Sequence, residues 1–326
     1  MKFGIAISSF AFAALTAIVP LSAQAQAWPS KQPIKFVVPY PPGGASDVTA
    51  RLLSVKLTEA LGQSVVVENR PGANGILALD LVAKSAPDGY TILMANLGPN
   101  GINPGVYHKL PYDPIKGFTP ITLTSVVPLV VLVTPTLPVK SMQELITYAK
   151  GNPGKLTYAS AGNGSANHLA GEMMKTMTGM QVVHVPYKGD SPAVADVAGG
   201  TVSMMFPTVV AGIPHIKSGK LRALAVTGAK RSSSLPNVPT VSEAGIPGFE
   251  AVSWGGVMGP AGLPPEITNR LNSEIVQILK MPDVAEKLTS LGADIVGSTP
   301  EEFGAYLKAE IAKWGKVAHD NNIKLD

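Results

Sequence analysis

The sequence predicts an α/β protein of two domains joined by crossing strands. Short β-like runs alternate with helical runs, the alternation starts again near residue 156, and a glycine-bearing loop opens the first helix of each half. Alternation of this kind favours parallel sheets with right-handed crossovers. A chain of 326 residues is also long enough to bury two cores.

The first half, from Trp28 onward, has the pattern of a βαβαβ unit. Apolar runs predict strands at 34–38, 65–67 and 90–95, and periodic apolar residues predict helices at 47–61 and from Asn74-Gly75 to 84. Gly62 marks the end of the first helix. The β-rich residues 128–134 lie between the halves, so they predict a strand that crosses into the second domain.

The second half repeats this architecture without repeating the sequence. Strands are predicted at 156–160, 182–185, 202–206 and 221–226, and helices at 141–150, 165–178, 192–197 and 209–218. Ser141 and Glu144 form a capping box for the first of these helices. Residues 231–248 are rich in Ser, Pro and Gly and predict a loop, and residues 251–258 predict the return crossing.

The C-terminal part is helical, with runs that begin at Pro265, Pro282 and Pro300. Thr299 and Glu302 form a second capping box. The last helix carries an apolar stripe of Phe303, Leu307, Ile311 and Trp314. We expect this stripe to pack on the first domain, which then comprises residues 28–128 and 251–326, with residues 129–250 as the second domain.

Residues 1–27 have the pattern of a secretory signal peptide. Lys2 precedes an apolar run, and two A-x-A sites predict cleavage after Ala25 or Ala27. A retained membrane anchor is the alternative, but the run is short for a span and no charged stop-transfer segment follows it. We therefore expect an exported protein.

The composition argues against several classes of function. The chain has no cysteine, which excludes disulfides, thiol catalysis and cysteine–metal sites. The net charge of +4 falls by one to +3 without Lys2, and it is scattered, with no basic run to bind nucleic acid. We expect no nucleic-acid partner.

Two glycine loops of similar design are the candidate site. The first glycine loop is residues 38–47 and the second is residues 158–165; each follows a predicted strand and opens a predicted helix. Backbone N–H groups and a helix N-terminus would face an anion there. The helix end would stabilise the anion by ~0.3–2 kcal/mol and each N–H bond by ~1.5–3 kcal/mol. Two such loops could support micromolar binding, about −8 kcal/mol. For either loop alone, an ordinary turn between strand and helix remains the alternative.

Nucleotide, metal and hydrolase signatures are missing from the sequence. The run from Gly162 begins like a dinucleotide fingerprint but lacks the third glycine and a later acidic residue, and there is no P-loop. The five histidines show no metal-binding spacing, and no G-x-S-x-G occurs. Ser165 and His168 are expected to be a helix cap and a packing residue. We expect no cofactor, metal or catalytic residue, with an exported α/β hydrolase as the alternative.

Several sequence segments carry a family resemblance. They are Val37-Val38-Pro39-Tyr40-Pro41-Pro42-Gly43-Gly44 with Asp47, Glu68-Asn69-Arg70-Pro71-Gly72-Ala73, Pro87-Asp88-Gly89-Tyr90-Thr91, Gly164-Ser165 with His168-Leu169, Val185-Pro186-Tyr187-Lys188-Gly189, Gly219-Lys220-Leu221-Arg222-Ala223-Leu224-Ala225-Val226 and Val238-Pro239-Thr240. Across the whole mature chain, these segments resemble the periplasmic solute-binding component of tripartite tricarboxylate transporters, the Bug receptor family.

The resemblance implies a two-lobed periplasmic-binding-protein fold, type II-like, that closes on a small carboxylate. It implies a periplasmic location and a partner in the membrane subunits of a transporter; we expect a monomer. A sensor that docks on a signalling receptor is the alternative. The expected ligand-binding residues are Tyr40, Pro42, Gly43, Gly44, Ala45, Ser46 and Asp47, then Ser160, Ala161, Gly162, Asn163, Gly164 and Ser165, and finally Tyr187, Phe206, Pro207 and Thr208.

One departure from the family pattern bears on the ligand. Many members have the pattern V-D-x-x-F-D where this chain has Val202–Thr208, so Ser203 and Pro207 replace both acids. The second acid could bind a ligand amine. Its replacement argues against an amino acid and favours a mono- or dicarboxylate, aromatic ones included.

Overall fold

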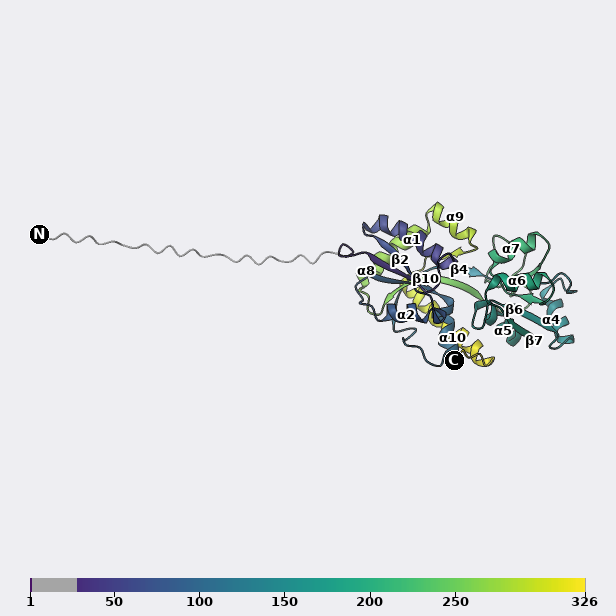
Figure 1. Cartoon of the computed structure of the whole chain (residues 1–326). Coiled ribbons are helices and arrows are strands. Elements are labelled where there is room, and N and C mark those ends of the chain that lie inside the picture. Colours follow the sequence, from purple (N-terminus) through teal and green to yellow (C-terminus); the bar gives the residue numbers. More distant parts are fainter. Residues whose placement is uncertain (2–27, 326) are drawn as a thin grey trace.

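The computed structural model describes Met1 and residues 28–325, and those residues form two α/β lobes (Figure 1). Apart from Met1, the predicted signal peptide lies outside the described residues. Within the described part of the chain, no helix is long and apolar enough to cross a membrane.

Lobe 1 is built on a six-stranded sheet in the order β11-β4-β10-β3-β1-β2. Its strands are β1 (Ile34–Val38), β2 (Val65–Asn69), β3 (Thr91–Asn96), β4 (Phe118–Pro128), β10 (Val252–Pro260) and β11 (Asp294–Ile295). β1 pairs in parallel with β2 and β3, which is the predicted βαβαβ unit. β10 pairs antiparallel with both β3 and β4, so the sheet is mixed.

Helices cover both faces of this sheet. They are α1 (Ala45–Leu61), α2 (Ile76–Ala83), α3 (Asn103–Val106), α8 (Pro265–Leu279), α9 (Pro282–Ser290) and α10 (Pro300–Asp320), with short turns η1 (Ala73–Gly75) and η2 (Leu97–Ile102). α1 packs beside α8 on one face, where Leu53 of α1 and Phe36 of β1 are fully buried. On the other face, Phe303, Leu307 and Trp314 of α10 are buried, which confirms the predicted packing of this helix on the first domain.

Lobe 2 is built on a five-stranded sheet in the order β7-β6-β8-β5-β9. Its elements are β5 (Val130–Val133), α4 (Met142–Gly151), β6 (Leu156–Ser160), α5 (Ala166–Thr178), β7 (Val182–Pro186), α6 (Asp190–Ala198), β8 (Met204–Met205), α7 (Val209–Lys217) and β9 (Arg222–Val226). β8 is shorter than the predicted 202–206. Beside it, the Thr157 and Ser203 side chains accept hydrogen bonds from each other's backbone N–H, in place of ladder bonds between backbones.

The chain crosses between the lobes twice, and the two crossings are tied together. The strand predicted at 128–134 is in fact two strands of different sheets, because β4 ends at Pro128 and β5 begins at Val130. The Thr227 hydroxyl accepts from Leu129 N at 2.8 Å and lies 2.6 Å from Ala251 O, to which it donates. Figure 1 shows the β10 end of the return crossing reaching towards the second lobe.

A buried carboxylate joins β10 to α10. Glu310 is 4% exposed. It accepts from Trp254 Nε1 at 3.1 Å and from Trp314 Nε1 at 2.9 Å, and it forms an ion pair with Lys313. Because a buried charge is costly unless it is paired, these donors fix Trp254 and α10 in one relative position.

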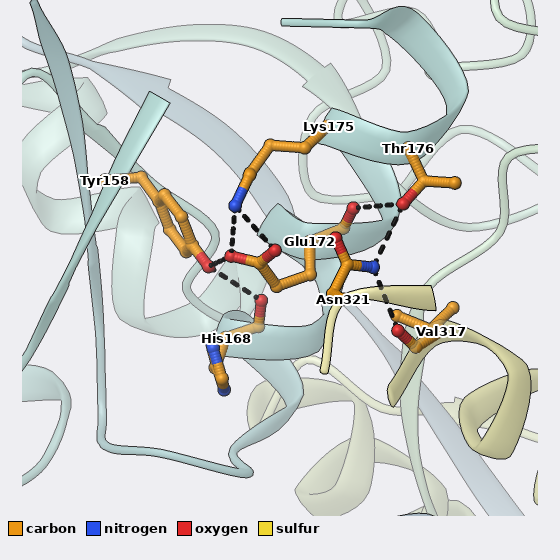
Figure 2. A network of polar contacts seen from close by, with 7 residues as sticks. All are labelled: Tyr158, His168, Glu172, Lys175, Thr176, Val317 and Asn321. Carbon is orange, nitrogen blue, oxygen red and sulfur yellow. Dashed lines mark hydrogen bonds and ion pairs between the residues drawn. The ribbon is translucent and has the colours of Figure 1, made fainter. Parts of the chain in front are cut away.

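A stack of rings fills the space between α5 and the sheet of lobe 2. His168 of α5 stacks on His184 of β7 with ring centroids 4.0 Å apart, and Tyr158 of β6 also stacks on His184, at 4.8 Å. The Tyr158 hydroxyl donates to Glu172, which also pairs with Lys175 (Figure 2). Burial lowers the pKa of His168 to about 4, with a further lowering by the neighbouring His184.

This stack predicts a loss of stability in mild acid. The pKa of His168 in the folded chain is below the unfolded value of about 6.5, so the unfolded chain binds more protons between these limits. The free energy of unfolding should be constant above about pH 6.5 and fall as the pH drops towards 4. Urea unfolding from pH 7.5 to 4.5 measures this.

His168→Asn is the matched variant. His168 Nδ1 accepts from Gly164 N at 3.0 Å, and an amide oxygen can take over this bond without titrating. It should lose less stability than the parent chain over the same pH range. An equal loss in both proteins would contradict the role of His168.

Candidate functional site

The first glycine loop is held in shape by the buried carboxylate of Asp47. Asp47 Oδ2 accepts from Gly43 N at 2.9 Å and from Arg51 Nε at 3.0 Å, and its Oδ1 accepts from Asn69 Nδ2 at 2.9 Å. Asn69 also donates to Tyr40 O at 3.0 Å. The bond from Arg51, followed by those from Gly43 and Asn69, lowers the pKa of Asp47 to about 2 against the opposing effect of burial.

Asp47 therefore braces the loop, and its role differs from the expected ligand contact. Its side chain is 4% exposed, and both of its oxygens already accept hydrogen bonds. Its negative charge is balanced by the guanidinium of Arg51. The charge on the first turn of α1 thus does not oppose an incoming anion as strongly as the sequence suggests.

The N-terminus of α1 is open. Its N-cap is Gly44, which supplies no side-chain cap, and its first intrahelical bond runs from Val48 N to Gly44 O at 3.0 Å. The N–H groups of Ala45, Ser46 and Asp47 precede that bond, so they have no partner within the helix. Pro42, Gly43, Gly44 and Ala45 are exposed. This end of α1 is therefore suited to hold an anion.

A cavity of about 70 Å³ lies beside this helix end. Its lining includes Ala45, Ser46 and Thr49 of α1 and, from other elements, Asn96, Ser125 and Ser253. The lining has no Lys or Arg, so its polar groups are hydroxyls and an amide. The volume is several times the ~10–15 Å³ that one buried water needs. A carboxylate or a few waters fit here.

Sequence reasoning missed four of these polar residues: Thr49, Asn96, Ser125 and Ser253. The position of Asn96 could have been predicted, because Asn96 ends β3 at the same sheet edge as the first glycine loop. In the structure, Ser46 Oγ donates to Asn96 Oδ1 at 2.6 Å. Ser125 and Ser253 lie on the neighbouring antiparallel strands β4 and β10. Nothing local in the sequence reveals that pairing.

In the second glycine loop, the N–H groups of Gly162 and Gly164 are bonded within the lobe, which corrects the expectation that both are free to bind a ligand. Gly162 N donates to Ser160 Oγ at 3.1 Å, Gly164 N to His168 Nδ1 at 3.0 Å, and Ser165 N to Gly162 O at 3.2 Å. Ala161 N contacts Asn167 Oδ1 at 3.4 Å. The Ser165 side chain caps α5 through His168 N. Lobe 2 thus presents a preformed surface, with exposed Asn163 at its tip.

The glycines of the two loops also differ. Gly44 has φ −78°, which any residue adopts, and a Cβ there would meet no atom within 4 Å. Gly164 has φ +75°, and a Cβ there would come within 2.7 Å of Leu325 Cδ1. Gly164 therefore serves packing and backbone shape, whereas the space beside Gly43 and Gly44 is open.

The remaining predicted site residues are mainly held by the fold. The Tyr187 hydroxyl donates to Asp196 Oδ2 at 2.6 Å, and Phe206 is fully buried against Tyr158. Pro207 O accepts from Val130 N, and Thr208 caps α7. None of these residues, and none of the second glycine loop, lines the 70 Å³ cavity.

The chemistry of a hydrolase finds little support in this geometry. Ser160 Oγ lies 2.7 Å from His184 Nε2, as a nucleophile and base would, but Ser160 is fully buried and its hydroxyl also holds the loop backbone. The described residues include no group of three His, Cys, Asp or Glu placed to bind a metal ion. A larger cavity of about 710 Å³ lies between α8 and α10, and neither glycine loop lines it.

Relatives of known sequence share nearly the whole chain. The protein in the tcbD–tcbE intergenic region of Pseudomonas sp. (strain P51) is 42% identical over 292 residues, covering 89% of this chain and 86% of that protein. Protein BugT of Bordetella pertussis is 38% identical over 311 residues, covering 95% of each.

Solved structures agree in fold. Rpa4515 of R. palustris, determined with adipate, is 41% identical with a TM-score of 0.77, over 91% of this chain and 99% of that one. MatC of Rhodopseudomonas palustris, determined with bound malate, is 33% identical with a TM-score of 0.74, over 88% of this chain and 99% of that one. The sequence profile of the tripartite tricarboxylate transporter family receptor matches residues 49–323. The chain therefore belongs to the receptor family of tripartite tricarboxylate transporters, which includes the Bug proteins.

Proposed function

We propose that this protein captures a small carboxylate between its two lobes and delivers it to the membrane subunits of a tripartite tricarboxylate-type transporter. The observation that carries the proposal is the open N-terminus of α1, which presents neutral donors beside a polar cavity. Membership of the receptor family supports the transport role. In this role the protein binds and releases its ligand unchanged, so it is not an enzyme.

The proposed ligand is a dicarboxylate without an amine. Adipate and malate, bound by two related proteins, are both of this kind. Ser203 and Pro207 leave this part of lobe 2 without a carboxylate to hold an ammonium group. One carboxylate of the ligand would bind the N–H groups of Ala45 and Ser46, and the rest of the ligand would extend towards Asn163 and Thr208 of lobe 2.

The energetics of this arrangement suffice for capture. Two charge-assisted N–H bonds at ~1.5–3 kcal/mol each, with ~0.3–2 kcal/mol from the helix end, approach the roughly −8 kcal/mol of a micromolar complex. Closure of the lobes would remove water from these bonds and strengthen them.

The wider proposal follows the family role. We propose a periplasmic monomer, exported by a signal peptide at residues 1–27. The lobes would correspond to residues 28–128 with 251–326 and to residues 129–250, since each sheet takes its strands from one of these sets.

Calorimetric titration of the mature protein with adipate, malate, benzoate and glutamate tests the ligand class. We expect micromolar affinity for at least one of the two dicarboxylates and much weaker binding of glutamate, whose ammonium group meets no acidic partner. Tight binding of glutamate with no affinity for adipate or malate would contradict the proposal.

Gly44→Val should weaken dicarboxylate binding about 100-fold. The valine side chain would stand at the N-terminus of α1 and block hydrogen bonds to the ligand that contribute about 3 kcal/mol to binding. The fold accepts this side chain, since Gly44 has ordinary φ and open space. Gly151→Val in α4, where a Cβ also meets nothing within 4 Å, is the control and should bind normally. Calorimetry and thermal unfolding of both variants separate binding from folding; normal affinity of Gly44→Val would remove α1 from the site.

Asp47→Ala should lower the free energy of unfolding by about 2–4 kcal/mol and the ligand affinity at least tenfold, because the donors of Gly43 and Asn69 lose a buried acceptor. Since the pKa of Asp47 is about 2, the wild-type contribution is complete above about pH 4 and is lost only as the pH falls through 2. Urea unfolding and calorimetry at pH 7 measure both effects.

Asp283→Ala is the matched control for this variant. Asp283 pairs with Lys56 of the same helix α1, but its side chain is 60% exposed. This control should change neither quantity. An Asp47→Ala protein that behaved like the control would show that the Asp47 hydrogen bonds do not shape the site.

A further inference from the structure

We propose that the C-terminal tail, residues 321–325, is a positioning element that belongs to lobe 1 and holds the second glycine loop of lobe 2 in shape through Leu325. The proposal rests on the proposed function, since it assigns the tail a role in ligand binding. It also links the position of one lobe to the conformation of a loop in the other.

The tail is anchored to lobe 1. α10 ends at Asp320, and Asn322 adopts a left-handed conformation with φ +53°, which turns the chain back. Ile323 N then donates to Ala318 O at 2.8 Å, and Leu325 N donates to Val106 O of α3 at 3.0 Å. The backbone of the tail is thus fixed against two helices of the first lobe.

Two side chains of the tail reach lobe 2. Asn321 Nδ2 donates to Thr176 Oγ1 of α5 at 3.0 Å, and it also donates to Val317 O at 2.9 Å within α10 (Figure 2). Leu325 lies over Gly164, so closely that a Cβ on Gly164 would be 2.7 Å from its Cδ1. The tail therefore touches α5 near its C-terminal end and also the loop that precedes it.

Gly164 is the residue through which Leu325 can affect the conformation of the second glycine loop. Its φ of +75° and its N–H bond to His168 Nδ1 fix the turn that places Asn163 on one side and the helix cap Ser165 on the other. Leu325 covers this turn with an apolar side chain and occupies the space that a Cβ would need. Without that cover, water could compete for the Gly164 N–H and the loop would lose its single conformation.

The titration of His168 provides a readout that needs no ligand. The charged and titratable groups around it are Glu172 and Lys175 on its own helix, His184 on β7 and Tyr158 on β6. If the turn at Gly164 opens, His168 becomes more hydrated and its pKa rises from about 4 towards the ordinary value of about 6.5.

The test compares Leu325→Ala with Lys324→Ala, which removes an exposed side chain from the same tail. NMR titration of His168 in the mature protein is the first measurement, and calorimetry with adipate as the probe is the second. We expect Leu325→Ala to raise the pKa of His168 by at least one unit and to weaken adipate binding 3- to 10-fold, while Lys324→Ala matches the wild type. Leu325→Met, which keeps an apolar cover of similar volume, should restore both values.

An unchanged pKa of His168 in Leu325→Ala would overturn the contact's role in shaping the loop. A raised pKa with unchanged adipate affinity would overturn its role in ligand positioning. If the wild-type protein binds malate but not adipate, malate replaces adipate as the probe. If it binds neither, the proposed ligand class fails, and the His168 titration still decides whether the tail shapes the loop.

Discussion

The Asp47 carboxylate is the interaction on which the geometry of the candidate site depends. It takes up the donors of Gly43, Arg51 and Asn69, and Asn69 in turn holds the backbone at Tyr40. With its charge balanced by Arg51, the first turn of α1 is free to attract an anion. Arg51 thus acts by neutralising Asp47, and a bound anion would contact neutral backbone N–H groups.

The two glycine loops, similar in sequence, are different in physical character. In the first, the helix end has no side-chain cap and the glycines stand in open space. In the second, Ser160, Ser165 and His168 take the donors, and Leu325 fills the space above Gly164. Under the proposed function, the bonded second loop would lower the entropy lost on ligand binding, while the open helix end of the first loop would supply the polar attraction.

Local pattern predicted most of the architecture and the position of the first loop. β1, α1 and the buried stripe of α10 follow from apolar periodicity. The capping box at Thr299 is confirmed, whereas at Ser141 only the N-cap bond from Glu144 N forms and the Glu144 side chain accepts from Lys140 N. The mixed character of the first sheet was not predictable, because the β4–β10 pairing joins segments more than a hundred residues apart. The same holds for Ser253 in the cavity and for Leu325 over Gly164. The sequence predicts a glycine loop at 158–165, but only the fold shows that the N–H groups of Gly162 and Gly164 are bonded to Ser160 and His168.

Amide chemical shifts of the two loops test the central claim most directly. In ¹⁵N-labelled mature protein titrated with a dicarboxylate that binds, the account predicts large downfield shifts of the Ala45 and Ser46 N–H signals, with only small shifts of the Gly162 and Gly164 signals. The reverse pattern, with Gly162 and Gly164 shifted strongly and the first turn of α1 unaffected, would contradict it.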